Sequence, residues 1–339
     1  MIEHMQKTNK ISIKLKNIAN LLFLASILSV GNILNANNQN VSKDVKKPIE
    51  IRIDNNGQVI RDQSGYGRND NNNGQNTRIS TDAQRGGTET ISNSAGTIRV
   101  DTSYSSQGQD YRQKFIILHY TAGNRDSSLK TLTKNEVSAH YMVSDDKSEP
   151  VYSLVDENKR AWHAGVSEWK GRNNLNDTSV GIEIVNGGDV SGTFVPYKDF
   201  QIKEVAVLVK YLADKYEIPA TNILGHSDIA PQRKSDPGPL FPWKELYTKY
   251  NIGMWYDNDT KNNYEREYST KLSMMPVSEI QRELNKFGYG ISITGTWDKQ
   301  TKNVIKVFQH HFRPSNYSGE MDVETFAILK ALNEKYNKK

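Results

Sequence analysis

The stretch FIILHY (Phe115–Tyr120) is a continuous apolar run that follows a long polar segment. A run of this length and composition favours a strand that is buried on both faces of a sheet. Four further runs predict strands: AHYMV (Ala139–Val143), VYSLV (Val151–Val155), VGIEIV (Val180–Val185) and NILGH (Asn222–His226). The five runs together predict a sheet in the interior of one domain.

Two helices are expected to flank this sheet. Between Phe200 and Tyr216, apolar residues recur at the i, i+3, i+4 and i+7 positions of an amphipathic helix. The segment PWKELYTKY (Pro242–Tyr250) predicts a second helix with proline in its first turn. Strands mixed with helices over residues 113–252 predict an α/β domain with a central mixed β-sheet flanked by helices.

The first 36 residues have the pattern of a secretory signal peptide. Four lysines precede an apolar stretch that runs from about Ile18 to Gly31: Lys7, Lys10, Lys14 and Lys16. The stretch is shorter than the roughly 20 residues of a membrane-spanning helix. Cleavage is expected after Gly31 or Ala36, and an uncleaved anchor or a buried helix is the alternative. The pattern predicts export to the periplasm or the extracellular space, without a stable membrane anchor after cleavage.

Composition excludes several kinds of site. The 339 residues contain 44 Lys and Arg against 39 Asp and Glu, which is a net charge of only +5, and no cysteine. No run of Lys and Arg interleaved with aromatic residues indicates a nucleic-acid groove. Without cysteine the chain forms no disulfide, thiolate nucleophile or lipoprotein-type lipid anchor, and a metal would be bound by His, Asp or Glu.

Residues 37–112 differ in composition from the rest. They are dominated by Asn, Gln, Ser, Gly, Asp and Thr, as in RNDNNNGQNT (Arg68–Thr77). Such a segment buries too little apolar surface to offset the entropy of ordering it, so we expect a largely disordered tether. Two β-like pieces within it, IEIRI (Ile49–Ile53) and TIRV (Thr97–Val100), are candidates for pairing with the domain that follows.

A polar linker over residues 253–274 is followed by a segment with three apolar helical faces, over residues 275–336. A short pattern precedes the second and the third helix, TGTWDKQT (Thr294–Thr301) and SGEMDVET (Ser318–Thr325). In each copy a glycine suits a turn, and Asp298 or Asp322 is placed to cap the helix that follows. These features predict a small three-helix C-terminal domain.

Four of the seven histidines fall in the α/β domain, and two of these end predicted strands. His119 and His226 are at such strand ends, where α/β folds present functional side chains, and Asp236 follows ten residues after His226. Two imidazoles and one carboxylate form a common catalytic zinc site. The alternative is that His226 is a hydrogen-bonded core residue and Asp236 caps a Pro-Gly turn. His310 and His311, on the C-terminal helices, are expected to have a surface or packing role.

Glu183 interrupts an apolar strand. In VGIEIVN it alternates with Ile182 and Ile184, so it faces the opposite side of the strand. A buried carboxylate is costly unless it is paired, hydrogen-bonded or needed for function. The strand pattern therefore leaves a functional carboxylate and a structural ion pair as two open interpretations.

The motifs FIILHYTAG, VSAHYMV, RAWHAG, SVGIEIVN and ILGHSDIAPQRKSDPG occur in this order over about Gln113–Tyr250. This combination resembles the type 2 N-acetylmuramoyl-L-alanine amidases, in the branch of the AmpD and AmiD enzymes. The resemblance implies the fold shared with peptidoglycan recognition proteins. It also implies that His119, His226 and Asp236 are zinc ligands. Glu183 would be the general base and Lys234 the oxyanion-stabilising cation. His140 and His163 would contact the substrate.

The C-terminal segment resembles the three-helix peptidoglycan-binding domain. This resemblance implies that peptidoglycan and muropeptides are the partners. The protein is expected to be a monomer. The implied reaction is hydrolysis of the amide between the muramoyl lactyl group, in ordinary or 1,6-anhydro form, and L-alanine of the stem peptide. Two other functions fit the sequence less well. A non-catalytic receptor is disfavoured because all the implied zinc and catalytic residues are present, and a stem peptidase because no HExxH motif occurs.

Overall fold

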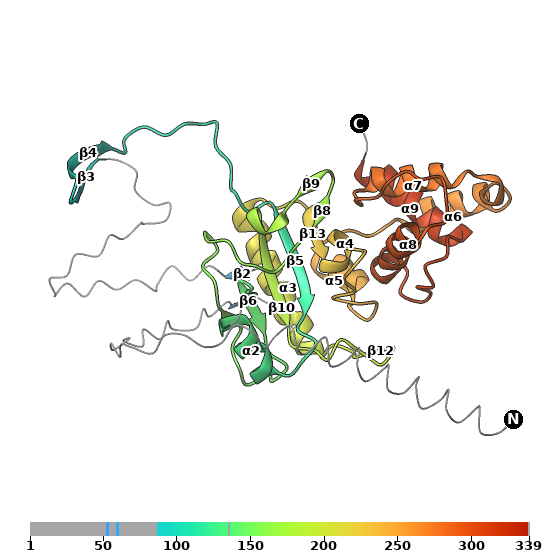
Figure 1. Ribbon diagram of the computed structural model, residues 1–339, viewed down its shortest axis with the longest axis horizontal. Helices are drawn as coiled ribbons and strands as arrows, with labels where there is room; N and C mark the ends of the chain where they lie inside the picture. Colours follow the sequence, from blue (N-terminus) through green and yellow to red (C-terminus); the bar gives the residue numbers. More distant parts are fainter. Residues whose placement is uncertain (1–51, 54–58, 61–86, 135, 338–339) are drawn as a thin grey trace, which may run out of the picture. The chain divides into compact units, whose positions relative to one another are not determined.

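The protein is described by a computed structural model that places residues 52–53, 59–60, 87–134 and 136–337 (Figure 1). The predicted signal peptide and most of the predicted tether lie outside these residues. None of the described helices is both long enough and apolar enough to cross a bilayer.

A five-stranded mixed sheet forms the centre of the α/β domain, in the order β13-β5-β10-β6-β7. The strands are β5 (Phe115–Tyr120), β6 (Tyr141–Val143), β7 (Tyr152–Ser153), β10 (Ser179–Ile184) and β13 (Ile223–Gly225). Strands β13, β5, β10 and β6 are parallel, and β7 pairs antiparallel with β6. The predicted mixed sheet is confirmed.

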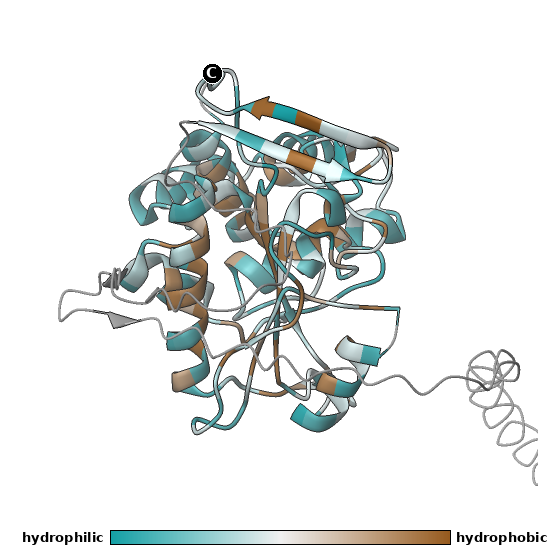
Figure 2. Cartoon of the chain, turned by 90° about the vertical axis from the view of Figure 1, so that its left-hand side faces the viewer, coloured by the Kyte–Doolittle hydropathy of each residue, from teal (hydrophilic) through white to brown (hydrophobic). Residues whose placement is uncertain are grey.

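Strand β5 has neighbours on both edges and is covered on both faces. Ile116, Ile117 and Leu118 have no exposed surface, as expected from its uninterrupted apolar sequence. Helix α3 (Asp199–Tyr216) packs against the sheet through Val205, Val209 and other apolar residues. Figure 2 shows hydrophobic segments, in brown, in the strands and helices of the interior.

Shorter elements complete the domain. They are α2 (Arg125–Lys134), α4 (His226–Ile229), α5 (Trp243–Tyr250), the hairpins β8 (Glu168–Trp169)–β9 (Arg172–Asn173) and β11 (Asp189–Val190)–β12 (Thr193–Phe194), and the 3-10 helices η1 (Leu175–Asp177) and η2 (Ala220–Asn222). The predicted helix at Pro242–Tyr250 is confirmed, because α5 begins directly after Pro242.

The three predicted C-terminal helices are α7 (Val277–Phe287), α8 (Lys299–Phe312) and α9 (Val323–Tyr336). Both predicted caps are confirmed: Asp298 accepts a hydrogen bond from the backbone N of Thr301, and Asp322 accepts one from that of Thr325. Each bond satisfies one of the amide groups that a helix N-terminus leaves unpaired.

The predicted linker is not an extended connection. It contains helix α6 (Asn258–Tyr268) and a short 3-10 helix, η3 (Leu272–Met274). Tyr268 packs edge-on against Phe326 of α9 with ring centroids 4.9 Å apart, and Tyr264 Oη donates to Glu334 Oε2 over 3.0 Å. Helix α6 forms in a polar sequence because α9 provides contacts for tyrosines spaced one turn apart.

Strand pairing in the predicted tether is local among the described residues, and TIRV, a candidate for pairing with the α/β domain, does not join its sheet. TIRV lies in β4 (Gly96–Asp101), which forms an antiparallel hairpin with β3 (Thr88–Asn93). Asn93 Oδ1 accepts from Ala95 N over 2.8 Å in the turn, which closes the hairpin with a short loop. Likewise β1 (Arg52–Ile53) pairs with β2 (Val59–Ile60).

Candidate active site with a His-His-Asp centre

Parallel pairing of β5 and β13 brings two histidines to the same edge of the sheet. Gly225 of β13 is in register with Leu118 of β5, so the next residues, His226 and His119, are neighbours. Ligands of open α/β sheets bind at this carboxyl edge of parallel strands. Asp236 arrives on the loop after α4, where its backbone O accepts from Ser227 N over 2.8 Å. The predicted trio is therefore assembled by one sheet edge and one loop.

The three side chains converge at their donor atoms. His119 Nδ1 lies 2.9 Å from His226 Nδ1, and Asp236 Oδ2 lies 3.0 Å from each of these nitrogens. All three residues are buried. The alternative of a hydrogen-bonded core histidine and a turn cap is not what the structure shows, because both side chains point to one common centre.

The tautomer of His226 follows from its second ring nitrogen. Nε2 lies 3.1 Å from the carbonyl O of Ala164, and a carbonyl can only accept. Nε2 therefore carries a proton, and Arg233 Nη2, which lies 3.3 Å from it, directs its two hydrogens at carbonyl oxygens. In the tautomer with its proton on Nε2, Nδ1 is a bare lone pair. Arg233 secures this carbonyl, because Nη2 donates to Ala164 O and also to Val166 O, the latter over 2.7 Å.

The tautomer of His119 is set by a longer chain of hydrogen bonds. Ser179 Oγ donates its only hydrogen to Leu175 O over 2.6 Å, so it accepts from His163 Nε2 at 3.0 Å. Neutral His163 then has a bare Nδ1, which accepts from His119 Nε2 over 3.0 Å. His119 Nδ1 is thus left without a proton and faces the other two ligand atoms.

Two lone pairs and a carboxylate oxygen are therefore within 3.0 Å of each other with no hydrogen between them. Burial lowers the pKa of His119 to about 4, so His119 is neutral at pH 7. Such a donor set needs a cation, and two imidazoles with one carboxylate fit zinc.

Glu183 lies beside this centre. It is in register with His119 on the adjacent parallel strand, so both side chains emerge at the same edge and on the same face of the sheet. Burial raises its pKa to about 8, the charge of Asp236 adds to this, and that of Lys234 opposes it. Its Oε2 is buried without a hydrogen-bond partner, and no cation pairs with it among the described residues. The structural ion pair considered above is absent from this part of the chain.

Lys234 is exposed on the loop between α4 and Asp236, where its backbone N donates to Ala230 O over 3.1 Å. Its positive charge lowers the pKa values of both His119 and Glu183. The ammonium group is therefore close enough to act electrostatically on the same site. Lys234 is thus an exposed basic residue whose charge acts on the site.

His140 and His163 are placed as supporting residues rather than on an open surface. His140 has no exposed surface; its Nδ1 accepts from Gly181 N over 3.0 Å, and its Nε2 donates to Lys159 O over 3.1 Å. Both ring nitrogens of His163 are used by His119 and Ser179. These placements give both histidines structural partners, and the substrate contact that the family resemblance implied stays a prediction.

The supporting role of His163 was not found from the sequence, and neither were Ser179 and Arg233, although one signal was present. A Cβ on Gly181 would lie 2.4 Å from Cγ of His163, so the glycine in SVGIEI makes room for that ring. Ser179 and Arg233 had no comparable signal, because their partners lie 16 and 67 to 69 residues away along the chain.

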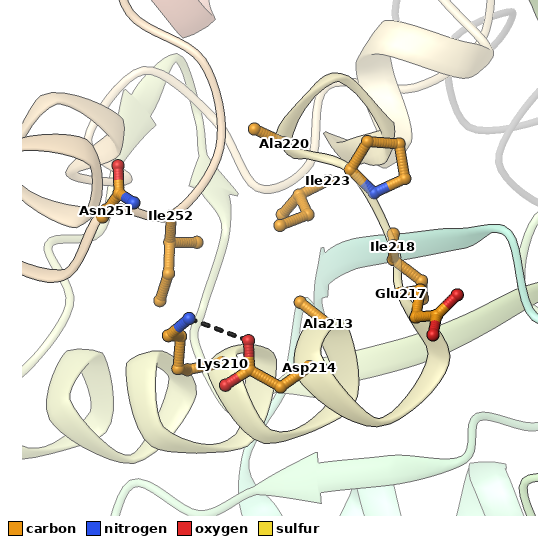
Figure 3. Close-up of a pocket in the computed structure, with 10 residues that line it drawn as sticks. Lys210, Ala213, Asp214, Glu217, Ile218, Ala220, Ile223, Asn251 and Ile252 are labelled. Atoms are coloured by element: carbon orange, nitrogen blue, oxygen red, sulfur yellow. Dashed lines mark hydrogen bonds and ion pairs between the residues drawn. The ribbon is translucent and has the colours of Figure 1, made fainter. Parts of the chain in front are cut away.

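A cavity of about 400 Å³ lies elsewhere in the domain, between the end of α3 and the segment after α5 (Figure 3). Its lining includes Ile218, Ile223, Ile252 and the ion pair Lys210–Asp214. None of the seven predicted site residues lines it. The cavity therefore has no part in the site described above.

Comparisons with known proteins match the chain to amidases and to a peptidoglycan-binding domain. The family described as N-acetylmuramoyl-L-alanine amidase matches residues 109–239, and a peptidoglycan-binding domain family matches residues 274–329. The chain is 41% identical over 249 residues to the N-acetylmuramoyl-L-alanine amidase AmiD of Escherichia coli, covering 70% of this chain and 88% of AmiD.

Two solved structures share the fold. AmpDh3 from Pseudomonas aeruginosa, in complex with anhydromuramic pentapeptide, aligns with a TM-score of 0.65 and 42% identity over 69% of this chain and 96% of that one. E. coli AmiD, in complex with anhydro-N-acetylmuramic acid-L-Ala-D-γ-Glu-L-Lys, aligns with a TM-score of 0.65 and 39% identity over 74% and 99%. With its α/β domain, its carboxylate-flanked centre and its C-terminal domain, the chain belongs to the N-acetylmuramoyl-L-alanine amidases.

Proposed function

We propose that this amidase is zinc-dependent, with His119, His226 and Asp236 as the ligands, Glu183 as general base and Lys234 as the oxyanion-stabilising cation. The observation that carries the proposal is the convergence of two unprotonated Nδ1 atoms and one carboxylate oxygen beside Glu183. The five residues supply two imidazoles, two carboxylates and one ammonium group.

Bound to these ligands, zinc would polarise the scissile carbonyl and lower the pKa of a water molecule. Glu183 accepts the proton of the attacking water at its carboxylate and passes it to the leaving nitrogen of L-alanine. A base whose pKa lies near the working pH also gives the proton back readily.

Lys234 stabilises the oxyanion that develops on the carbonyl. Its positive charge acts electrostatically on His119 and Glu183. Removal of one well-placed oxyanion donor typically costs about 10²–10³ in kcat. His163 and Ala164 hold the ligand imidazoles in the orientation that presents Nδ1. Such partners of metal ligands fix the tautomer and raise the basicity of the ring.

The proposed substrate is the amide between the muramoyl lactyl group and L-alanine of the stem peptide, with the 1,6-anhydro sugar included. Support comes from the two related structures that contain anhydromuramic peptides. The C-terminal match to a peptidoglycan-binding domain supports peptidoglycan and muropeptides as partners. The N-terminal signal-peptide pattern supports an exported protein that acts on the wall in the periplasm or outside the cell.

The test uses the purified protein on wall sacculi and on anhydro-muropeptides, with mass spectrometry of the products and measurement of bound zinc. We expect a released stem peptide with an N-terminal L-alanine, about one zinc per chain, and loss of both zinc and turnover in Asp236→Ala. A protein that binds muropeptide but releases nothing would be a receptor. A product in which L-alanine stays on the sugar would identify a peptidase, and either result overturns the proposal.

A further inference from the structure

Asp228 is a buried carboxylate that connects the two domains. It belongs to α4, two residues after His226, and only 1% of its surface is exposed. Its Oδ2 accepts from Gly225 N and from His311 Nδ1, each over 2.8 Å, and its Oδ1 accepts from Tyr289 Oη over 2.8 Å. Two of the three donors therefore come from the C-terminal domain.

The donor from α8 is held in place by aromatic packing. The ring of His311 is stacked between Trp243 of α5 and Phe312, with centroids 3.9 Å from each and interplanar angles of 13° and 10°. His311 is 2% exposed. The imidazole is thus fixed between the two domains and cannot turn away from Asp228 without breaking both stacks.

The second donor is part of a backbone contact between the domains. Tyr289 has no exposed surface and packs edge-on against Trp169 of β8, with centroids 5.1 Å apart. Lys170 N donates to Gly288 O over 2.8 Å, and Trp169 forms a β-bridge with Tyr289. The C-terminal domain is therefore joined to the α/β domain by buried side chains and by main-chain bonds.

Helix α4 depends on outside contacts for its position. It has only four residues, and a single helical turn is not stable by itself in water. Asp228 ties the turn to the end of β13 through Gly225 N, but its carboxylate is buried and needs its other donors as well. Without Tyr289 and His311 the carboxylate would be left partly unsatisfied, which favours a shift of α4 toward water.

We propose that the C-terminal domain is a structural support of the metal site: through Tyr289, His311 and Asp228 it holds the α4 turn that presents His226. Helices α4 and α8, which carry Asp228 and His311, are in contact (Figure 1). The residues act as positioning residues and do not touch substrate. The inference rests on the proposed function, because its readout is metal binding at His119, His226 and Asp236.

The test compares full-length variants by zinc affinity, measured in competition with a chromophoric chelator, and by the absorption spectrum of the cobalt-substituted protein. We expect Tyr289→Phe with His311→Leu to weaken zinc binding about 10-fold, the lower end for loss of a partner of a metal ligand, and to change the cobalt spectrum. His311→Asn, which keeps an N–H donor near the position of Nδ1, should restore most of the affinity lost in His311→Leu.

The matched control is Lys302→Ala, which removes an exposed ion pair with Glu320 from the same helix and should leave affinity and spectrum unchanged. If the double variant does not fold, Tyr289→Phe alone decides, since it removes one oxygen and leaves the ring packed. Unchanged affinity and spectrum in a folded double variant, or in Tyr289→Phe where the double variant fails to fold, overturn the inference. A wild-type protein that binds no zinc would instead overturn the proposed function.

Discussion

His163 Nδ1 lies 3.0 Å from His119 Nε2, and this contact determines which nitrogen of His119 faces the other two ligand residues. The series of hydrogen bonds continues from His163 Nε2 to Ser179 Oγ and ends at the carbonyl of Leu175. Because a carbonyl only accepts, every proton in the chain has one position. The nitrogen of His119 that faces His226 and Asp236 is thus set by a main-chain carbonyl 56 residues away along the sequence.

We expect His163→Phe to weaken zinc binding by about 10- to 100-fold, since it removes the acceptor that holds the proton on His119 Nε2. Ser179→Ala should give a smaller loss in the same direction, because His163 keeps its contact with His119 but loses its own fixed tautomer. Zinc affinity is measured by competition with a chelator. Ser153→Ala, at an exposed position on β7, is the matched serine control and should have wild-type affinity. Equal affinities in all three variants would contradict the role given to this chain.

Gly181→Ala should disturb the same hydrogen bonds by displacing the His163 ring. The added Cβ would lie 2.4 Å from Cγ and 2.6 Å from Cδ2 of His163, so the ring must move. We expect a loss of about 1–3 kcal/mol in the free energy of unfolding, together with weaker zinc binding. Gly108→Ala is the control, since its Cβ would meet only Ser106 Oγ at 3.7 Å. Urea denaturation measures the first effect, and a Gly181→Ala protein as stable as this control would refute the steric argument.

Glu183→Gln should abolish proton transfer while leaving the metal site assembled. The amide has nearly the same shape as the carboxylate but accepts no proton from water, so turnover should fall by about 10²–10⁴. Zinc content should remain at the wild-type level, because Glu183 lies beside the three ligand atoms and is not one of them. Product release from a muropeptide and bound zinc are measured on the same sample. Near-normal turnover of Glu183→Gln would show that Glu183 is not the general base.

The stability of the metal-free protein should depend on pH through Glu183. Burial raises its pKa from 4.5 to about 8 in the folded state, so the native protein binds this proton more tightly than the unfolded chain does. The free energy of unfolding should therefore fall, from this group, as pH rises from about 4.5 to about 8. Glu183→Gln lacks the group, so the variant should gain stability relative to wild type over this window. Denaturation curves with chelator at pH 5, 6.5 and 8 measure the difference, and parallel curves would contradict it.

Lys234→Met should lower kcat by about 10²–10³ if its ammonium group stabilises the oxyanion. Zinc affinity should not decrease, because removing a positive charge near the ligands does not disfavour binding of a cation. Lys234→Arg keeps the charge and should retain part of the activity. Steady-state kinetics on one muropeptide compare the three proteins. An unchanged kcat in Lys234→Met would show that Lys234 does not stabilise the oxyanion.

Much of the fold and the proposed ligand set could be predicted because the signals are local. The apolar run Phe115–Tyr120 indicated a buried strand, and Asp298 and Asp322 indicated helix starts, since both depend on residues a few positions apart. The ordered motifs pointed to His119, His226 and Asp236 before any geometry was known. The role of each ligand atom was not contained in those motifs.

Local patterns did not show contacts with residues elsewhere in the chain. Helix α6 within the predicted linker was not expected, because its helical state depends on Phe326 and Glu334 of α9. The TIRV segment was a candidate for pairing with the following domain, yet it pairs with the strand just before it. In both cases the sequence showed the tendency of the segment but not the surface it would meet.

The sequence by itself determined the strands, the helix starts, the family and the identity of the candidate ligands, because each of these is written in short-range patterns. Only the tertiary structure decided that Nδ1 of both histidines faces the centre, that Ser179 and Ala164 hold them so, and that His311 supports Asp228. Those outcomes depend on hydrogen bonds between residues 16, 62 and 83 positions apart. A proton's position on an imidazole is set by the partner in space, and spacing along the chain does not specify that partner.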